Sequence, residues 1–167
     1  FSQPYMEAAL ARYPILARLL VELFAARFDP AREGEGGEEA RVRLQAELDA
    51  IHDPTLDENA HTIIEEVAYA RGLDRAAQAD AALDALAILL ERVSSLDEDR
   101  ILRSFIGVIE ATLRTSFYQR GDDGEFRDYT AFKFDPALIP ELPRPRPFRE
   151  TFVCSPRVEG VHLRFGK

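Results

Sequence analysis

Hydrophobic side chains recur at helical spacing along most of the chain, and the pattern is strongest over residues 95–118. Six large apolar side chains there fall three or four positions apart and so share one helix face: Leu102, Phe105, Ile106, Ile109, Leu113 and Phe117. Ser95 and Glu98 stand at capping-box spacing, in which the serine oxygen accepts a backbone N–H and the glutamate reaches back to the cap. The pattern predicts one long amphipathic helix over residues 95–118, against which the other elements pack.

Five further helices are predicted before it. Pro14 ends the first helix and opens the second, because proline is well tolerated only in the first turn of a helix. A loop rich in glycine and charge covers residues 29–37, Asp53-Pro54 breaks the chain again, and Gly72 suits a helix C-terminus. The predicted helices cover residues 5–12, 15–28, 38–52, 59–71 and 74–93.

Capping-box spacing recurs at Thr55 and Glu58, directly before the predicted helix over residues 59–71. Each of the two boxes follows one helix and opens another. A duplicated helical hairpin is one interpretation, and chance recurrence of a short capping pattern is the other.

The character of the chain changes after residue 118. Residues 129–134 are aromatic and β-prone, which predicts a strand. Residues 149–154 and 161–165 predict two more strands, paired as an antiparallel hairpin at the edge of a sheet. Between them and the first strand lies an extended, stiff connector over residues 135–147, predicted from Pro136, Pro140, Pro143, Pro145 and Pro147.

The predicted fold class is therefore mainly α. About six helices pack as an irregular bundle, followed by a short C-terminal β-hairpin or strands that look like the start of a truncated sheet. We expect a helical domain over residues 1–120, a strand plus proline-rich connector over 121–147, and the first strands of a following domain over 148–167. Both ends of the chain look like cuts through a longer polypeptide, because no signal-peptide pattern opens it and a strand-like run closes it.

Composition limits the classes of function. A chain of 167 residues with 46% hydrophobic and 31% charged residues is typical of one soluble globular domain. A formal net charge of −9 argues against binding to nucleic acid or to an anionic membrane surface. No apolar run approaches the roughly 20 residues of a membrane span. The single cysteine, Cys154, excludes an internal disulfide and fits a reducing, cytoplasmic setting.

Few residues carry a pattern that indicates chemistry. His61 and Glu65 lie one helical turn apart and could present two metal ligands, but no third ligand is evident, so a solvated helix face is the plainer interpretation. Asp122-Asp123-Gly124 lacks the alternating oxygen ligands of a calcium loop. Five acidic residues at helix starts admit catalysis or capping, and capping is favoured because a catalytic carboxylate normally needs a perturbed environment in a cleft: Asp57, Glu58, Asp97, Glu98 and Asp99.

The last quarter of the chain holds the remaining candidates. Cys154 has no motif partner, so a structural thiol is favoured over a nucleophile. Arginines suit either the binding of a phosphate or carboxylate or ion pairs across an interface, and we favour the interface for Arg144, Arg146, Arg149, Arg157 and Arg164. We therefore predict no catalytic, cofactor-binding or metal-ligating residue in this chain.

The C-terminal stretch resembles a known family. Residues 155–163, SPRVEGVHL, are similar to the lead-in to the catalytic core of the large bacterial NAD-dependent glutamate dehydrogenases. Further segments resemble the stretch before that core: LLVELFAARFDP at 19–30, EATLRTSFY at 110–118, FKFDPALIP at 132–140 and the proline-rich run from 144 onward.

The resemblance implies a parent enzyme that oxidatively deaminates L-glutamate to 2-oxoglutarate and ammonia and passes hydride to NAD. It implies that this chain is a non-catalytic helical segment that supports architecture, oligomer contacts or regulation. The implied partners are the catalytic core of the same polypeptide, whose first strands are residues 148–167, and further subunits of a homo-oligomer.

The family's catalytic lysine, catalytic aspartate and dinucleotide-binding fold have no matching position here. No catalytic residue is carried over, and Lys167 is assigned no role. NAD is therefore expected in the parent enzyme and no cofactor in this segment. The residues alone leave a second hypothesis open, in which the chain is a stand-alone helical protein-interaction module.

Overall fold

A computed structural model describes residues 1–139 and 142–166, so Pro140 of the predicted connector and Lys167 lie outside the described residues. The chain divides into two compact units, Phe1–Phe105 and Ile106–Lys167, and each is described by itself. None of the helices in the described ranges combines the length and the apolarity that crossing a bilayer requires. The helices are α1 (Gln3–Arg12), α2 (Pro14–Phe28), α3 (Gly37–Asp49), α4 (Asn59–Ala70), α5 (Arg75–Leu90) and α6 (Leu96–Ala111), with a 3-10 turn η1 (Pro30–Arg32) after α2.

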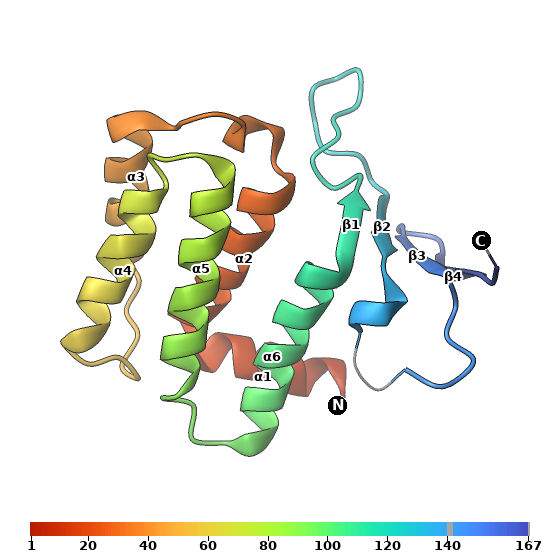
Figure 1. Ribbon diagram of the computed structural model, residues 1–167, viewed down its shortest axis with the longest axis horizontal. Coiled ribbons are helices and arrows are strands. Elements are labelled where there is room, and N and C mark those ends of the chain that lie inside the picture. Colours follow the sequence, from red (N-terminus) through yellow and green to blue (C-terminus); the bar gives the residue numbers. More distant parts are fainter. Residues whose placement is uncertain (140–141, 167) are drawn as a thin grey trace. The chain divides into compact units, whose positions relative to one another are not determined.

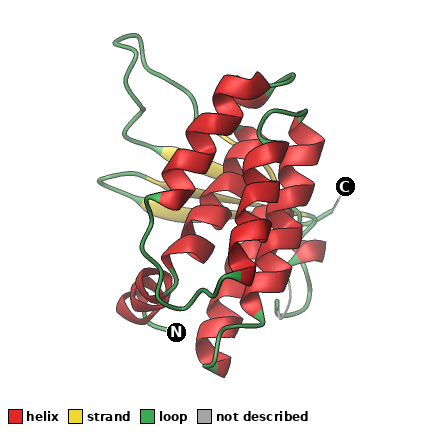
Figure 2. Ribbon diagram, turned by 90° about the vertical axis from the view of Figure 1, so that its left-hand side faces the viewer, coloured by secondary structure: helices red, strands yellow, loops and turns green. Residues whose placement is uncertain are grey.

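The first unit is a bundle in which α2 packs closely against α5. Helix α5 also contacts α4, and α4 packs against α3. Figures 1 and 2 show these four helices running alongside one another, while α1 crosses one end of α2. The core consists of apolar side chains from all of these helices and from the start of α6, the largest being Ile15, Leu19, Leu23, Leu48, Val67, Leu86, Leu89, Leu90, Ile101 and Leu102.

Local chemistry sets the helix boundaries. Pro4 and Pro14 stand in the first turns of α1 and α2, where a missing backbone N–H leaves no hydrogen bond unmade. Asp74 caps α5, because its carboxylate accepts the N–H of Ala77 at 2.9 Å. The five helices predicted before residue 94 are confirmed, with ends that differ by at most three residues.

The sixth helix is shorter than predicted. It ends at Ala111, and residues Thr112–Thr115 form strand β1 instead of continuing the helix to residue 118. Two of the four residues of β1 are β-branched threonines, and the backbone of β1 pairs with a strand that lies later in the chain. Leu113 and Phe117 therefore do not extend the apolar helix face.

Only one of the two predicted capping boxes forms, and only in part. Ser95 Oγ accepts the N–H of Glu98 at 3.4 Å, but the Glu98 carboxylate bonds to Arg12 and Tyr13 in α1 and the α1–α2 junction. At the second position the prediction is wrong. Asp57, not Thr55, accepts the N–H of Ala60 at the start of α4.

Thr55 instead closes a turn with Asp53, because its N–H and hydroxyl both donate to Asp53 Oδ1. The shared capping feature that suggested a duplicated hairpin is therefore missing from this part of the chain.

The second unit contains an antiparallel sheet, whose described strands run in the order β1-β2-β3-β4. After β1 come β2 (Thr130–Phe134), a 3-10 turn η2 (Pro136–Leu138), β3 (Arg149–Cys154) and β4 (Glu159–Arg164). Phe152 in the middle of β3 lies opposite Phe132 of β2 on one side and Val161 of β4 on the other. The predicted strand at 129–134 and the predicted hairpin are confirmed, as is the mainly α fold class.

We expect Leu102→Ala to lower the free energy of unfolding of the chain by about 2–5 kcal/mol, because it leaves a cavity in the core of the first unit. Leu102 is 1% exposed, whereas Leu96 in the same helix is 72% exposed. The matched control, Leu96→Ala, should change the free energy by less than about 0.5 kcal/mol. Urea unfolding followed by circular dichroism measures both. Equal effects of the two substitutions would contradict this assignment of the buried face.

Candidate functional site

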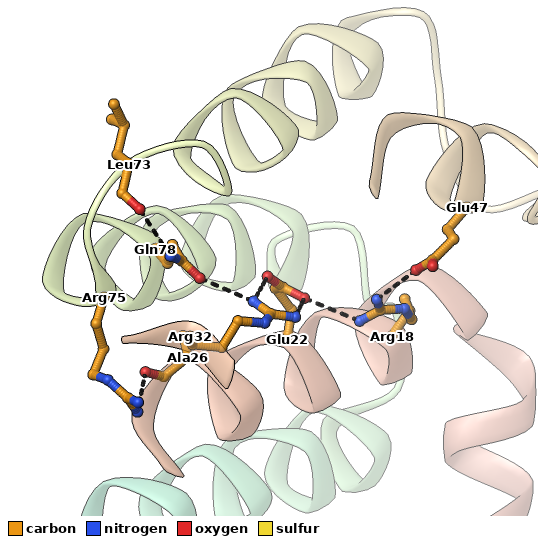
Figure 3. Close-up of polar contacts among 8 residues, drawn as sticks. All are labelled: Arg18, Glu22, Ala26, Arg32, Glu47, Leu73, Arg75 and Gln78. Atoms are coloured by element: carbon orange, nitrogen blue, oxygen red, sulfur yellow. Dashed lines mark hydrogen bonds and ion pairs between the residues drawn. The ribbon is translucent and has the colours of Figure 1, made fainter. Parts of the chain in front are cut away.

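A carboxylate lies inside the helical unit. Glu22 of α2 is 1% exposed, and both of its oxygens are bound by Arg32 of η1. Arg32 Nη1 lies 2.5 Å from Oε1 and Arg32 Nη2 lies 3.0 Å from Oε2, which is the bidentate geometry that makes arginine–carboxylate pairs strong. Arg18, one turn earlier in α2, adds a third contact at 3.3 Å. Figure 3 shows Glu22 held between the two guanidinium groups.

The network extends from Glu22 to other elements (Figure 3). Gln78 of α5, itself 2% exposed, accepts from Arg32 Nη1 at 3.0 Å and donates to the carbonyl oxygen of Leu73 at 2.9 Å. Arg18 also reaches Glu47 of α3 at 2.9 Å. These bonds connect α2, η1, α3 and α5 through side chains that range from the buried Glu22 and Gln78 to the half-exposed Glu47.

Arg75 closes the end of α2 next to this network. Its guanidinium donates to the carbonyl oxygen of Asp29 at 2.6 Å and to that of Ala26 at 3.1 Å; Ala26 is in the last turn of α2, where carbonyls lack an intrahelical partner. A cation at this position also stabilises the negative end of the helix dipole. Arg75 therefore joins the start of α5 to the end of α2.

The charges in this network decide the ionisation of Glu22. Burial opposes the charged form, but the hydrogen bonds and charge of Arg32, together with Arg18, outweigh it and lower the pKa of the Glu22 carboxyl below its ordinary 4.5. A general base works best with a pKa near the operating pH. Glu22 is therefore a stably ionised structural carboxylate, and its chemistry does not suit proton transfer at neutral pH.

A second buried carboxylate belongs to one of the residues singled out from the sequence. Glu98 is 8% exposed; it accepts from Arg12 Nη1 at 3.0 Å and from the Tyr13 hydroxyl at 2.9 Å. Burial and the Glu98 carboxylate raise the pKa of Tyr13, which keeps the phenol protonated as a donor. The arrangement connects the α1–α2 junction to the start of α6.

His61 and Glu65, the pair considered as metal ligands, lie one turn apart on α4 and line different hollows. His61 lines a hollow of about 660 Å³ that also holds His52, whereas Glu65 lines a different hollow beside Tyr69. Within the described ranges, no three histidine, cysteine or carboxylate side chains gather closely enough to hold a metal ion.

The other acidic candidates make structural contacts. Asp57 caps α4 and accepts from Arg92 at 3.1 Å, and this hydrogen bond lowers its pKa. Asp99 pairs with Arg103 one turn later at 2.9 Å. Asp123 accepts the N–H of Glu125 at 3.0 Å and so closes a surface turn. Each of these three carboxylates thus makes a local structural contact: a helix-start hydrogen bond for Asp57, an ion pair for Asp99 and a turn for Asp123.

The arginines of the second unit do not converge on one point. Arg149 and Arg164 face each other across β3 and β4, and both guanidinium groups lie over the ring of Phe148, at 4.1 and 5.9 Å. Arg157 lies in the turn at the opposite end of the same strand pair. Cys154 is half-buried, with its sulfur 3.7 Å from Glu159 Oε1.

Sequence reasoning did not single out Glu22 or its partners. A signal was present, because Glu22 interrupts the apolar face of residues 15–28 and stands four positions after Arg18, a spacing that favours an ion pair. Arg32, which carries most of the compensation, lies in the loop predicted over residues 29–37. No local pattern links it to Glu22.

Comparison with known proteins covers the whole chain. The family model for the catalytic domain of bacterial NAD-glutamate dehydrogenase matches residues 85–167, and the model for glutamate dehydrogenase helical motif 3 matches residues 1–30. This chain is similar to the NAD-specific glutamate dehydrogenase of Halomonas elongata, with 39% identity over 99% of this chain. It is also similar to the protein of that name from Pseudomonas aeruginosa, with 40% identity over 100% of this chain. The Mycobacterium tuberculosis protein of that name is 39% identical over 99% of the chain. This chain spans 8% of the length of each relative.

We expect Glu22→Gln to lower the free energy of unfolding by about 3 kcal/mol near neutral pH, because it removes the carboxylate that binds Arg32 through both oxygens and one of the carboxylates that pair with Arg18. The folded-state pKa of Glu22 is lowered, so its ionised form stabilises the fold above the ordinary 4.5, and this contribution is lost as the pH falls below that value. The difference between variant and wild type should therefore shrink in acid.

Urea unfolding at about pH 7 and about pH 3 measures this difference, with Glu66→Gln, at an exposed carboxylate of α4, as the control. The control should stay within about 0.5 kcal/mol of wild type at neutral pH. A deficit for Glu22→Gln that is the same at both pH values would contradict the assignment of an ionised Glu22.

Proposed function

We propose that this chain, which belongs to the family of bacterial NAD-glutamate dehydrogenases, is a non-catalytic supporting segment of such an enzyme. The parent would oxidise L-glutamate to 2-oxoglutarate and ammonia, with NAD as hydride acceptor. The segment would contribute architecture, contacts between subunits or regulation. The main support for this proposal is the similarity to NAD-specific glutamate dehydrogenases along the whole chain.

The internal polar contacts support a structural role for the helical unit. Its two buried carboxylates, Glu22 and Glu98, are both engaged by cations or a phenol of neighbouring elements. The lowered pKa of Glu22 keeps it ionised, and both carboxylates are buried, at 1% and 8% exposure. Carboxylates that bind side chains of neighbouring elements stabilise the arrangement of helices.

The second unit supports placing NAD elsewhere in the parent. Dinucleotide-binding folds are parallel sheets with crossover helices, and their phosphate-binding glycines follow the first strand. The described strands β1 to β4 are antiparallel, and no α-helix lies between them among the residues that the structure describes. We therefore propose that β3 and β4 lead into the catalytic core of the same polypeptide and that the dinucleotide-binding fold lies outside this chain.

The remaining features of the proposal concern the parent. We propose a cytoplasmic homo-oligomer, in which the helical unit contacts the catalytic core or a neighbouring subunit. The net charge of −9 supports partners other than nucleic acid or an anionic membrane surface.

The test is NADH formation from L-glutamate by a longer polypeptide that contains this chain, beside the same assay on the 167-residue chain. We expect turnover in the range of about 1–1,000 s⁻¹ for the longer protein and no NADH above the blank for the chain alone. Calorimetric titration of the chain with NAD, and separately with glutamate, should give no saturable heat.

Two results would contradict the proposal. Saturable binding of either compound to the chain would place a substrate or cofactor site within it. A folded longer polypeptide without glutamate dehydrogenase activity would instead favour a stand-alone helical protein-interaction module.

A further inference from the structure

A small cavity in the helical unit is lined mainly by arginines. Its volume is about 180 Å³, and its lining residues are Arg18, Arg32, Ala40, Arg43, Leu44, Glu47 and Arg71. Four guanidinium groups and one carboxylate thus surround one hollow in a chain whose net charge is −9. Positive charge is therefore concentrated at this hollow, from the largely buried Arg32 to Arg43, whose side chain is 67% exposed.

The internal carboxylates compensate only part of this charge. Glu22 binds Arg32 and Arg18, and Glu47 binds Arg18. The partner of Arg43 is Glu39, whose side chain is 87% exposed, and exposed pairs of this kind contribute little. The cavity therefore keeps a surplus of positive charge on the side formed by α3 and the end of α4.

Arg71 shows this surplus most directly. Its Nη1 is buried and has no hydrogen-bond partner among the residues that the structure describes. Burial and the neighbouring charge of Arg32 lower the pKa of Arg71, although a guanidinium remains protonated at neutral pH. A charged donor in this state is costly unless an anion or water accepts from it.

The backbone around Arg71 is shaped to admit its side chain. A Cβ atom at Gly36 would lie 2.6 Å from the carbonyl oxygen of Arg71 and closer still to Nη1. Any larger residue at position 36 would therefore displace Arg71. The loop is held in this place by the N–H of Gly37, which donates to the carbonyl oxygen of Gly72 at 3.2 Å.

The size of the cavity limits what it can hold. It is smaller than the ~300–1,000 Å³ of pockets that take drug-sized ligands, so a dinucleotide does not fit. It has room for several water molecules and hence for a small anion. Guanidinium forks match the oxygens of phosphate and carboxylate groups in particular.

We propose that this cavity binds a small oxyanion with two negative charges, either a phosphate group or a short dicarboxylate, and that Arg43 and Arg71 supply the charge that recognises it. Arg18 and Arg32, held in place by Glu22, form the back of the site. This proposal does not depend on the activity proposed for the parent.

The test is calorimetric titration of the 167-residue chain with inorganic phosphate and with succinate, at constant ionic strength, with chloride as the reference anion. We expect one saturable site for phosphate, for succinate or for both, and none for chloride. Binding of phosphate alone would identify a phosphate site, and binding of succinate alone a dicarboxylate site. Absence of saturable binding by both would overturn the proposal.

Substitutions locate the site. Arg71→Gln and Arg43→Gln should each weaken binding about tenfold or more, as the loss of a charge-assisted hydrogen bond predicts. Arg41→Gln is the matched control, because Arg41 lies on the same helix as Arg43 but pairs with Glu38 and lines a different hollow. An equal loss in Arg41→Gln would show general charge attraction and overturn the proposal.

Arg71→Gln could also unfold the helical unit, so the wild-type chain supplies an independent measurement. In a ¹H–¹⁵N NMR titration, the amide shifts caused by the bound anion should centre on residues 36, 40, 43 and 71. Shifts centred on another part of the chain would overturn the assignment of the cavity.

Discussion

The helical unit depends on the compensation of one charge buried against its core. Glu22 lies in α2, the helix whose apolar side chains Ile15, Leu19 and Leu23 are fully buried. Removing a carboxylate from water costs several kcal/mol, and only close, well-directed partners offset it. Arg32 meets that requirement with two parallel bonds, and it does so from a 3-10 turn outside the helix. The position of the turn after α2 is therefore coupled to the packing of α2 itself.

This coupling also accounts for the distribution of charge around the bundle. Glu22 neutralises Arg32 and helps to neutralise Arg18, and Gln78 provides a further acceptor at Arg32. The charges of Glu22 and Asp29 act on Arg71, but among the described residues no carboxylate hydrogen-bonds to its buried Nη1. The charge of Arg32 is thus neutralised within the protein, whereas the adjoining Arg71 has the chemistry of an anion site.

Local sequence patterns predicted those features whose causes are local. The prolines at positions 4 and 14 and the helical periodicity define α1 to α5 within three residues, and the β-prone runs after residue 128 define β2 and the β3–β4 hairpin. The end of α6 could not be found in this way, because Thr112–Thr115 become a strand through pairing with Thr130–Phe134. The resemblance of residues 155–163 to NAD-dependent glutamate dehydrogenases is confirmed by relatives that are similar along the whole chain.

Polar interactions between distant residues were the least predictable part. Glu98 has the spacing of a capping box, yet its partners are Arg12 and Tyr13, which lie more than 80 positions earlier. From the sequence, a carboxylate near a helix start can either cap that helix or bind a distant residue. Only the tertiary structure shows that the buried Glu98 binds its distant partners. The same holds for the arginine-lined cavity, whose members come from α2, η1, α3 and the end of α4.

The most direct test of this account is the ionisation of Glu22 itself. A pH titration of ¹³C-labelled glutamate side chains in the folded chain, with the Glu22 signal assigned by its absence from a Glu22→Gln sample, would measure it. The account predicts a carboxyl that stays ionised below its ordinary pKa of 4.5 for as long as the chain remains folded. A titration midpoint at or above 4.5 would show that Arg32 and Arg18 do not outweigh burial, and would contradict the account.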